Sequence, residues 1–216
     1  MSTKTGIRNT LIVICLFMAS MVGLLVHKMM SHPMLTAEQL RDHGVFIYEN
    51  PRIIKPFSLI DHHGKPFTNE RLQKKWTLMF FGYTSCPDVC PTTMAMLKQM
   101  VEGIKDKNIQ ASTQVLMVTV DPARDTVDKM AVYVPYFNKD FTGITGDFLK
   151  IHAFATNLGA PFQKVPNGGD NYSVDHSGYI FLVNPRGDAQ GFFRPPFSPD
   201  SFRQNYLSVR EIYQDL

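Results

Sequence analysis

Two uninterrupted apolar runs limit the folds that this chain can adopt. They are Trp76–Tyr83 (WTLMFFGY) and Val115–Val120 (VLMVTV). Continuous apolar runs of this length are typical of strands that are covered on both faces, whereas half-exposed strands alternate polar and apolar residues. Between the two runs, Pro91–Lys107 places its apolar residues at helical spacing. Two buried strands with a helix between them indicate a layered α/β domain.

The remaining segments extend this pattern. A hairpin is expected at Phe57–Phe67 around a polar turn, and a second at Tyr179–Phe193 around the Asn184–Gly187 turn. A short strand is expected at Phe141–Ile144. Helical signals recur in three later segments, Thr126–Phe137, Phe148–Leu158 and Ser198–Gln214. Strands that alternate with helices in this way predict a mixed sheet with helices on both faces.

The N-terminal segment has a different character. Leu11–Val26 contains 16 residues without a charge, with Lys4 and Arg8 before it and Lys28 after it. A membrane-spanning helix needs roughly 17–25 apolar residues, and basic side chains at the ends can extend a shorter run. We therefore expect a single N-terminal transmembrane helix. A cleaved signal peptide has a similar layout, but the small-x-small site that should end it is poorly matched here.

The net charge of the chain is also unevenly distributed along the sequence. The formal net charge of +3 arises before residue 31, because from Ser31 onward 19 basic residues balance 19 acidic ones. A neutral domain offers no basic face, so no nucleic-acid partner is expected. We expect a membrane anchor at residues 1–28, a tether at 29–50 and a folded domain at 51–216. The basic N-terminus favours a cytoplasmic start, which predicts a single-pass protein of the bacterial inner membrane with its domain in the periplasm.

Two of the three cysteines lie between the first buried strand and the helix after it. They are Cys86 and Cys90, whereas Cys15 lies in the N-terminal apolar run and is expected to be inert. Positions four apart on a helical turn share one face, so the two thiols can converge on one atom or pair with each other. A helix start favours a thiolate, so a lowered pKa is expected for a cysteine placed there. The alternative is a pair of small core residues.

A histidine supplies the third candidate ligand. His176 comes immediately before the apolar Tyr179–Val183 strand. In a thioredoxin-like topology the loop before that strand faces the cysteine motif. Thioredoxins place a cis-proline in this loop, but the chain has no proline between Val174 and Val183. His62 and His63 lie in the first hairpin turn, where we expect solvated side chains.

Two thiolates and an imidazole form an S₂N donor set. Soft thiolates select Cu(I), zinc or iron–sulfur clusters, and imidazole narrows the choice to copper or zinc. Structural zinc almost always takes four protein ligands, and the sequence offers no fourth cysteine or well-placed histidine. Copper(I), which tolerates three ligands, is therefore the metal expected at Cys86, Cys90 and His176.

Three segments together resemble the signatures of the Sco/SenC proteins. They are FGYTSCPDVCPTT (Phe81–Thr93), VTVDPARDT (Val118–Thr126) and VDHSGYIFLVNPRG (Val174–Gly187). The resemblance spans roughly Pro56 to the C-terminus. It implies a thioredoxin-like fold, with a mixed sheet and flanking helices, after a single N-terminal transmembrane helix. Sco/SenC proteins bind copper and serve assembly of the binuclear copper centre in subunit II of cytochrome c oxidase.

The resemblance assigns copper binding to Cys86, Cys90 and His176, with Asp175 tuning or orienting the site. Asp121 and Arg124 of the second segment match the family without a ligand role. The function implied is a membrane-anchored copper chaperone that delivers copper to subunit II. It would bind Cu(I), with Cu(II) left open, and would depend on a copper donor or a thiol reductant. Such a chaperone is not an enzyme.

A second function uses the same cysteines. Some members of the family are thought to act on thiols, so the alternative is a thiol–disulfide oxidoreductase that reduces the partner's copper-site cysteines. Cys86 would attack and Cys90 would resolve the mixed disulfide, which makes both catalytic and leaves a disulfide that cannot ligate copper. A peroxidase is disfavoured, because Met79 and Tyr83 occupy the positions where peroxiredoxins have proline and threonine.

Overall fold

The computed structural model describes residues 3–30, 34–166 and 172–214, and the chain forms two compact units, Met1–Met34 and Leu35–Leu216. The first unit contains one helix, α1 (Thr3–Met30). Among the described residues, no helix combines the length and the apolar character that crossing a membrane requires. The structure therefore does not confirm the transmembrane helix expected from the sequence.

The second unit is built around an eight-stranded sheet of order β1-β10-β9-β4-β5-β6-β2-β3. Its centre is the parallel pair β4 (Trp76–Gly82) and β5 (Thr113–Thr119), and every residue of β4 is buried. Two helices, α3 (Val89–Glu102) and the short α4 (Lys107–Ala111), lie between these strands in the chain. The prediction of two central buried strands is confirmed.

The other strands extend the sheet on both sides. They are β1 (Val45–Arg52), β2 (Ser58–Asp61), β3 (Pro66–Thr68), β6 (Thr142–Thr145), β9 (Ile180–Val183) and β10 (Ala189–Phe193). β6 continues the parallel pairing, whereas β9, β10 and β1 are antiparallel on the opposite side. The pairs β2–β3 and β9–β10 confirm both predicted hairpins.

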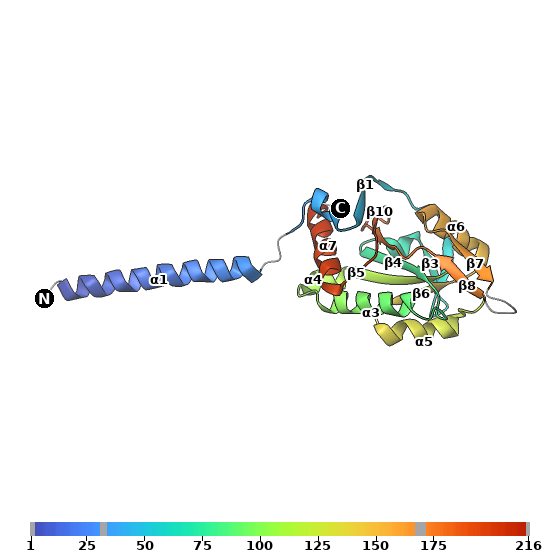
Figure 1. Ribbon diagram of the computed structural model, residues 1–216, viewed down its shortest axis with the longest axis horizontal. Helices are drawn as coiled ribbons and strands as arrows, with labels where there is room; N and C mark the ends of the chain where they lie inside the picture. The colour runs from blue at the N-terminus through green and yellow to red at the C-terminus, as the bar shows by residue number, and fades with distance from the viewer. Residues whose placement is uncertain (1–2, 31–33, 167–171, 215–216) are drawn as a thin grey trace. The chain divides into compact units, whose positions relative to one another are not determined.

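Helices cover both faces of the sheet, as predicted. α3, α5 (Val127–Phe137) and α7 (Pro199–Ile212) lie on one face and α6 (Phe148–Leu158) on the other (Figure 1). Phe193 of β10 packs on Phe202 of α7, with ring centroids 4.5 Å apart. On the opposite face Phe81 of β4 meets Phe154 of α6 at 6.0 Å. The sheet is therefore the middle layer of three.

The predicted tether at 29–50 is shorter than expected. Its second half folds as α2 (Ala37–Asp42) and β1, and both belong to the second unit. β1 joins the sheet because Val45, Phe46 and Ile47 pair with β10. The folded domain therefore begins at Leu35 rather than at residue 51.

A separate two-stranded sheet was not predicted. It consists of β7 (Phe162–Pro166) and β8 (Tyr172–His176), which pair in antiparallel register. Four of the five residues of β7 are exposed, so the strand lacks the apolar periodicity on which sequence analysis depends. This small sheet matters for the site because its second strand ends at His176.

The first hairpin turn differs from expectation at one histidine. His63 is exposed as predicted, but His62 is only 4% exposed, and its Nδ1 accepts a hydrogen bond from the Gly143 N–H at 2.8 Å. The turn lies against β6 because the His62 N–H also donates to the Gly143 carbonyl at 2.8 Å. Within the turn, the buried Asp61 carboxylate accepts the N–H groups of His63 and Lys65 at 2.9 and 3.0 Å. Burial lowers the pKa of His62, which suits a ring that must accept at Nδ1.

We expect His62 to make folding stability decline in mildly acidic solution. The unfolded chain takes up this proton near the ordinary histidine pKa of about 6.5, whereas the folded chain does so only at lower pH. The contribution of neutral His62 to the free energy of unfolding is complete above about pH 6.5. Below that pH it is lost, by at most about 1.4 kcal/mol per pH unit. Urea unfolding from about pH 8 down to about pH 5 measures this slope. His62→Asn keeps an acceptor but cannot titrate, so its slope should be smaller; an equal slope would contradict the assignment.

Candidate metal centre

The cysteines occupy the connection between β4 and α3. Tyr83–Cys86 form a turn in which the Cys86 N–H donates to the Tyr83 carbonyl at 3.2 Å. Cys86 is partly exposed in this turn, before the helix begins. Cys90 lies in the first turn of α3 and is fully buried. The two thiols therefore come from a turn and from a helix. The expectation that both lie on one helical face is wrong, because the helix begins after Cys86.

His176 approaches the cysteines from the end of β8. Its Nε2 lies 3.6 Å from the Cys90 sulfur, and its Nδ1 lies 3.1 Å from the Ser177 carbonyl oxygen. Because a carbonyl only accepts, this contact places the ring proton on Nδ1 and leaves the Nε2 lone pair facing the sulfur. The rings of Phe80 and Tyr83 each meet the imidazole edge to face at 5.9 Å. These contacts fix the orientation of the ring.

The structure brings the three predicted residues together. The ligand atoms of Cys86, Cys90 and His176 all lie within 4.8 Å of one another. Donors bound to one metal at about 2.0–2.3 Å stand roughly 3–4 Å apart, so a small inward movement suffices to share an ion. This is the only such group of potential ligands found in the part of the chain that the structure describes. The donor set fits copper.

Burial controls the protonation of the site. It raises the pKa of the Cys90 thiol, so the lowered pKa predicted for a cysteine at a helix start is wrong at this position. Burial lowers the pKa of His176, which keeps the imidazole neutral and able to ligate. A bound metal ion offsets the cost of ionising a buried thiol, because it supplies the opposite charge. The site therefore favours a thiolate that forms on metal binding over one that is free beforehand.

Asp175 is adjacent in sequence but is not a member of the cluster. It is exposed and pairs with Gln163 across the small sheet. Successive strand residues point to opposite faces, so the Asp175 carboxylate and the imidazole diverge. Its charge raises the pKa of His176, against the larger effect of burial. The ring is oriented by the Ser177 carbonyl instead.

Asp121 and Arg124 hold the start of β8. The Tyr172 hydroxyl donates to the Asp121 carboxylate at 2.7 Å, and Arg124 forms an ion pair with the same carboxylate. Arg124 also donates to the Tyr172 carbonyl at 3.2 Å and lies 3.9 Å above its ring. Neither residue belongs to the cluster of Cys86, Cys90 and His176. They anchor the strand whose other end carries His176, a role that a match to VDPARDT alone does not reveal.

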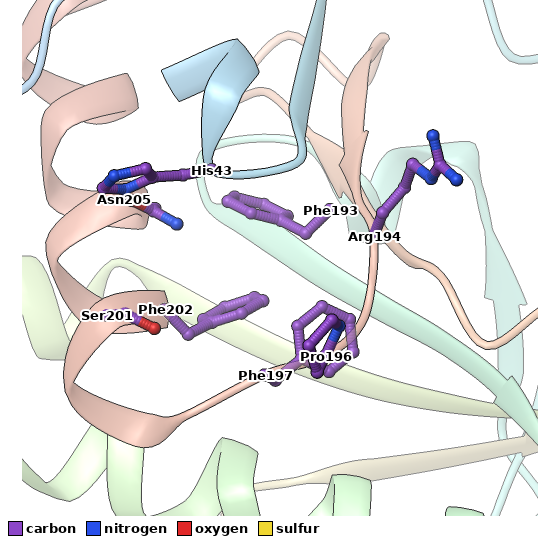
Figure 2. Close-up of a pocket in the computed structure, with 8 residues that line it drawn as sticks. All are labelled: His43, Phe193, Arg194, Pro196, Phe197, Ser201, Phe202 and Asn205. Carbon is purple, nitrogen blue, oxygen red and sulfur yellow. Dashed lines mark hydrogen bonds between the residues drawn. The ribbon is translucent and has the colours of Figure 1, made fainter. Parts of the chain in front are cut away.

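Two cavities on the described part of this unit have a histidine in their lining. A groove of about 650 Å³ runs beside the imidazole, between Phe162 and Tyr179. A smaller cavity of about 260 Å³ lies between β10 and α7 (Figure 2). The smaller cavity has one imidazole, His43, whose Nδ1 lies 3.1 Å from the Asn205 side-chain oxygen, and the rest of its lining is largely aromatic or proline. Of these two cavities, the groove is the one whose lining includes a member of the ligand cluster, His176.

Known proteins are similar to this chain in sequence and fold. The SCO1/SenC family model matches residues 47–209. A putative copper-binding protein of Stutzerimonas stutzeri is 34% identical over 161 residues, which cover 74% of this chain and 78% of that protein. Copper-bound ScoI of Arabidopsis thaliana is 32% identical, with a TM-score of 0.68 over 74% of this chain and 99% of that one. Copper-bound ScoI of Bradyrhizobium japonicum, also 32% identical, has a TM-score of 0.65 over 73% and 98%.

The fold and the donor set define a copper-binding protein of thioredoxin-like architecture. Within that class, the chain belongs to the SCO1/SenC family.

Proposed function

We propose that this chain is a copper chaperone. Cys86, Cys90 and His176 hold Cu(I) and pass it to the binuclear copper site of cytochrome c oxidase subunit II. The observation that carries the proposal is the convergence of two sulfurs and one imidazole nitrogen within 4.8 Å. Soft thiolates with an imidazole suit copper, and three donors leave room for an incoming ligand.

The differing burial of the ligands gives the transfer an order. Cys86 is partly exposed on its turn, and His176 lines the open groove, whereas Cys90 is fully buried. A thiolate of the acceptor therefore displaces His176 or Cys86 first, and Cys90 releases the ion last. Each exchange replaces one protein–copper bond with one acceptor–copper bond, so copper is never released to water.

The acceptor and the location are part of this proposal. The Sco/SenC resemblance supports subunit II as the acceptor and a copper donor or thiol reductant as a further partner.

The basic residues before the apolar N-terminal run support a site of action on the periplasmic face of a bacterial inner membrane. Alkaline phosphatase joined to the C-terminus should be active in such a host, since it folds only outside the cytoplasm. An inactive fusion, with the protein present, would contradict the location.

Direct copper transfer tests the function. The full chain, loaded with Cu(I), is mixed without oxygen with the reduced, copper-free soluble domain of subunit II. We expect copper to move to the acceptor even in the presence of a chelator that removes free Cu(I). Copper that stays with the chain, while the acceptor still binds Cu(I) supplied as a salt, would refute the proposal.

The second candidate is a thiol–disulfide oxidoreductase. It is favoured by the partly exposed thiol of Cys86 with the buried Cys90 behind it, and both are free thiols. The Cys86 thiolate attacks a partner disulfide and releases one partner thiol. Cys90 then attacks the mixed disulfide and releases the second. The partner gains two electrons and two protons, and the chain is left with a Cys86–Cys90 disulfide.

A further inference from the structure

The turn that presents Cys86 is held by a carboxylate from another part of the chain. Thr84 and Ser85 are the central residues of this turn. Thr84 donates twice to Asp125, from its N–H to Oδ2 at 3.0 Å and from its hydroxyl to Oδ1 at 2.5 Å. Asp125 is fully buried and lies just before α5. One carboxylate therefore fixes both the backbone and the side chain of Thr84.

A lysine extends this hold to the next residue. Lys129 Nζ lies 3.8 Å from the Asp125 Oδ1 and donates to the Ser85 hydroxyl at 3.0 Å. Ser85 directly precedes Cys86. Both central residues of the turn are thus tied to the start of α5.

Asp125 is in turn fixed to the sheet. The hydroxyl of Thr119, on β5, donates to its Oδ2 at 2.7 Å. The hydroxyl of Thr145, on β6, donates to its backbone carbonyl at 2.9 Å. Thr119 is fully buried and Thr145 is 4% exposed. Asp125 therefore links the turn to β5 through its carboxylate and to β6 through its backbone carbonyl.

We propose that Asp125 is a positioning residue for the metal centre, which acts through Thr84 and holds the Cys86 sulfur within reach of an ion shared with Cys90 and His176. Cys90 is already fixed by its helix and by full burial, and His176 by ring contacts and the Ser177 carbonyl. Of the three ligands, Cys86 is the one that lies on a turn between two elements, so its position depends on this support. Residues outside a ligand set that orient ligands typically contribute 10–100-fold in metal affinity.

A matched pair of Thr84 variants tests the proposal in the full chain. Thr84→Val keeps the shape but removes the hydroxyl donor, and Thr84→Ser keeps the donor. Competition with a chromogenic chelator measures the affinity for Cu(I). We expect the affinity of Thr84→Val to fall by about 10–100-fold and that of Thr84→Ser to remain near wild type. Alkylation of Cys86 in the metal-free protein should be faster in Thr84→Val, a change that does not depend on copper.

Thr119→Val is the structural control. It removes the hydrogen bond that Asp125 receives from the sheet and leaves both donors of Thr84 in place, so it should lower the free energy of unfolding with a smaller loss of affinity than Thr84→Val. Affinity losses in Thr84→Val and Thr119→Val that merely follow their losses of stability would overturn the proposal. Lys129→Met, at a 43% exposed side chain, provides a variant that is expected to fold and to lose affinity through Ser85.

This inference rests on the proposed copper ligands. The Cys86→Ser variant distinguishes a failure of the positioning role from a failure of the copper site. If Cys86→Ser loses copper while Thr84→Val and Lys129→Met bind it as tightly as wild type, Asp125 has no positioning role and the copper site stands. If Cys86→Ser still binds copper as wild type does, the proposed site is wrong and the inference fails with it.

Discussion

Replacement of Cys86 or Cys90 with serine is expected to abolish copper binding by this chain. In a titration with Cu(I), the reduced wild-type protein should bind about one equivalent tightly and each variant none, because a hydroxyl is a hard donor that does not replace a soft thiolate. The two remaining donors do not complete the set that converges within 4.8 Å. This is the largest effect that the site predicts.

The third cysteine supplies a matched control. Cys15 is exposed and lies in the other unit of the chain, so Cys15→Ser should keep the full equivalent. Since Cys90 is fully buried, Cys90→Ala provides a small apolar substitute for which correct folding is checked by circular dichroism. A full equivalent bound by both Cys86→Ser and Cys90→Ala would show that copper lies elsewhere.

His176→Ala is expected to separate the two candidate functions. Loss of the Nε2 donor should reduce the affinity for Cu(I) by more than the 10–100-fold typical of residues outside a ligand set. Thiol–disulfide exchange needs only the two sulfurs, so the rate at which the chain reduces a disulfide substrate should stay near wild type. The measurements are a Cu(I) competition titration and the release of a chromogenic thiol, both on the full chain.

His63→Ala provides the control, because that imidazole is exposed and belongs to the first hairpin turn. This variant should change neither the affinity for Cu(I) nor the rate at which the chain reduces a disulfide substrate. Unchanged copper affinity in His176→Ala would remove the imidazole from the ligand set and favour the oxidoreductase. If His176→Ala has a reduced affinity for Cu(I) but still carries out thiol–disulfide exchange, copper transfer is favoured as the role that requires His176.

The central part of the fold could be predicted because its signals are local. β4 and β5 are continuous apolar runs, and the α6 residues repeat with helical spacing. β1 was missed because it is an edge strand with only one buried residue, Val45. The small β7–β8 sheet was missed because it contributes little to the core. β1 joins the sheet by pairing with the distant strand β10, which a local sequence pattern does not indicate.

The ligands of the site were predictable, but their environment was not. Cys86 and Cys90 mark a strand–helix junction, and His176 precedes a buried strand, which places all three through topology. The raised pKa of Cys90 and the lowered pKa of His62 both follow from burial. Burial depends on the tertiary structure, so a sequence motif does not indicate it. The contact between Thr84 and Asp125 joins residues 41 positions apart, which no local pattern indicates.

X-ray absorption at the copper edge of the Cu(I)-loaded full chain measures the proposed ligand set itself. We expect a three-coordinate ion with two sulfur neighbours and one nitrogen neighbour, and loss of the nitrogen in His176→Ala. A site with sulfur neighbours alone in the wild-type protein, or one that is unchanged in His176→Ala, would refute the assignment of Cys86, Cys90 and His176 as the copper ligands.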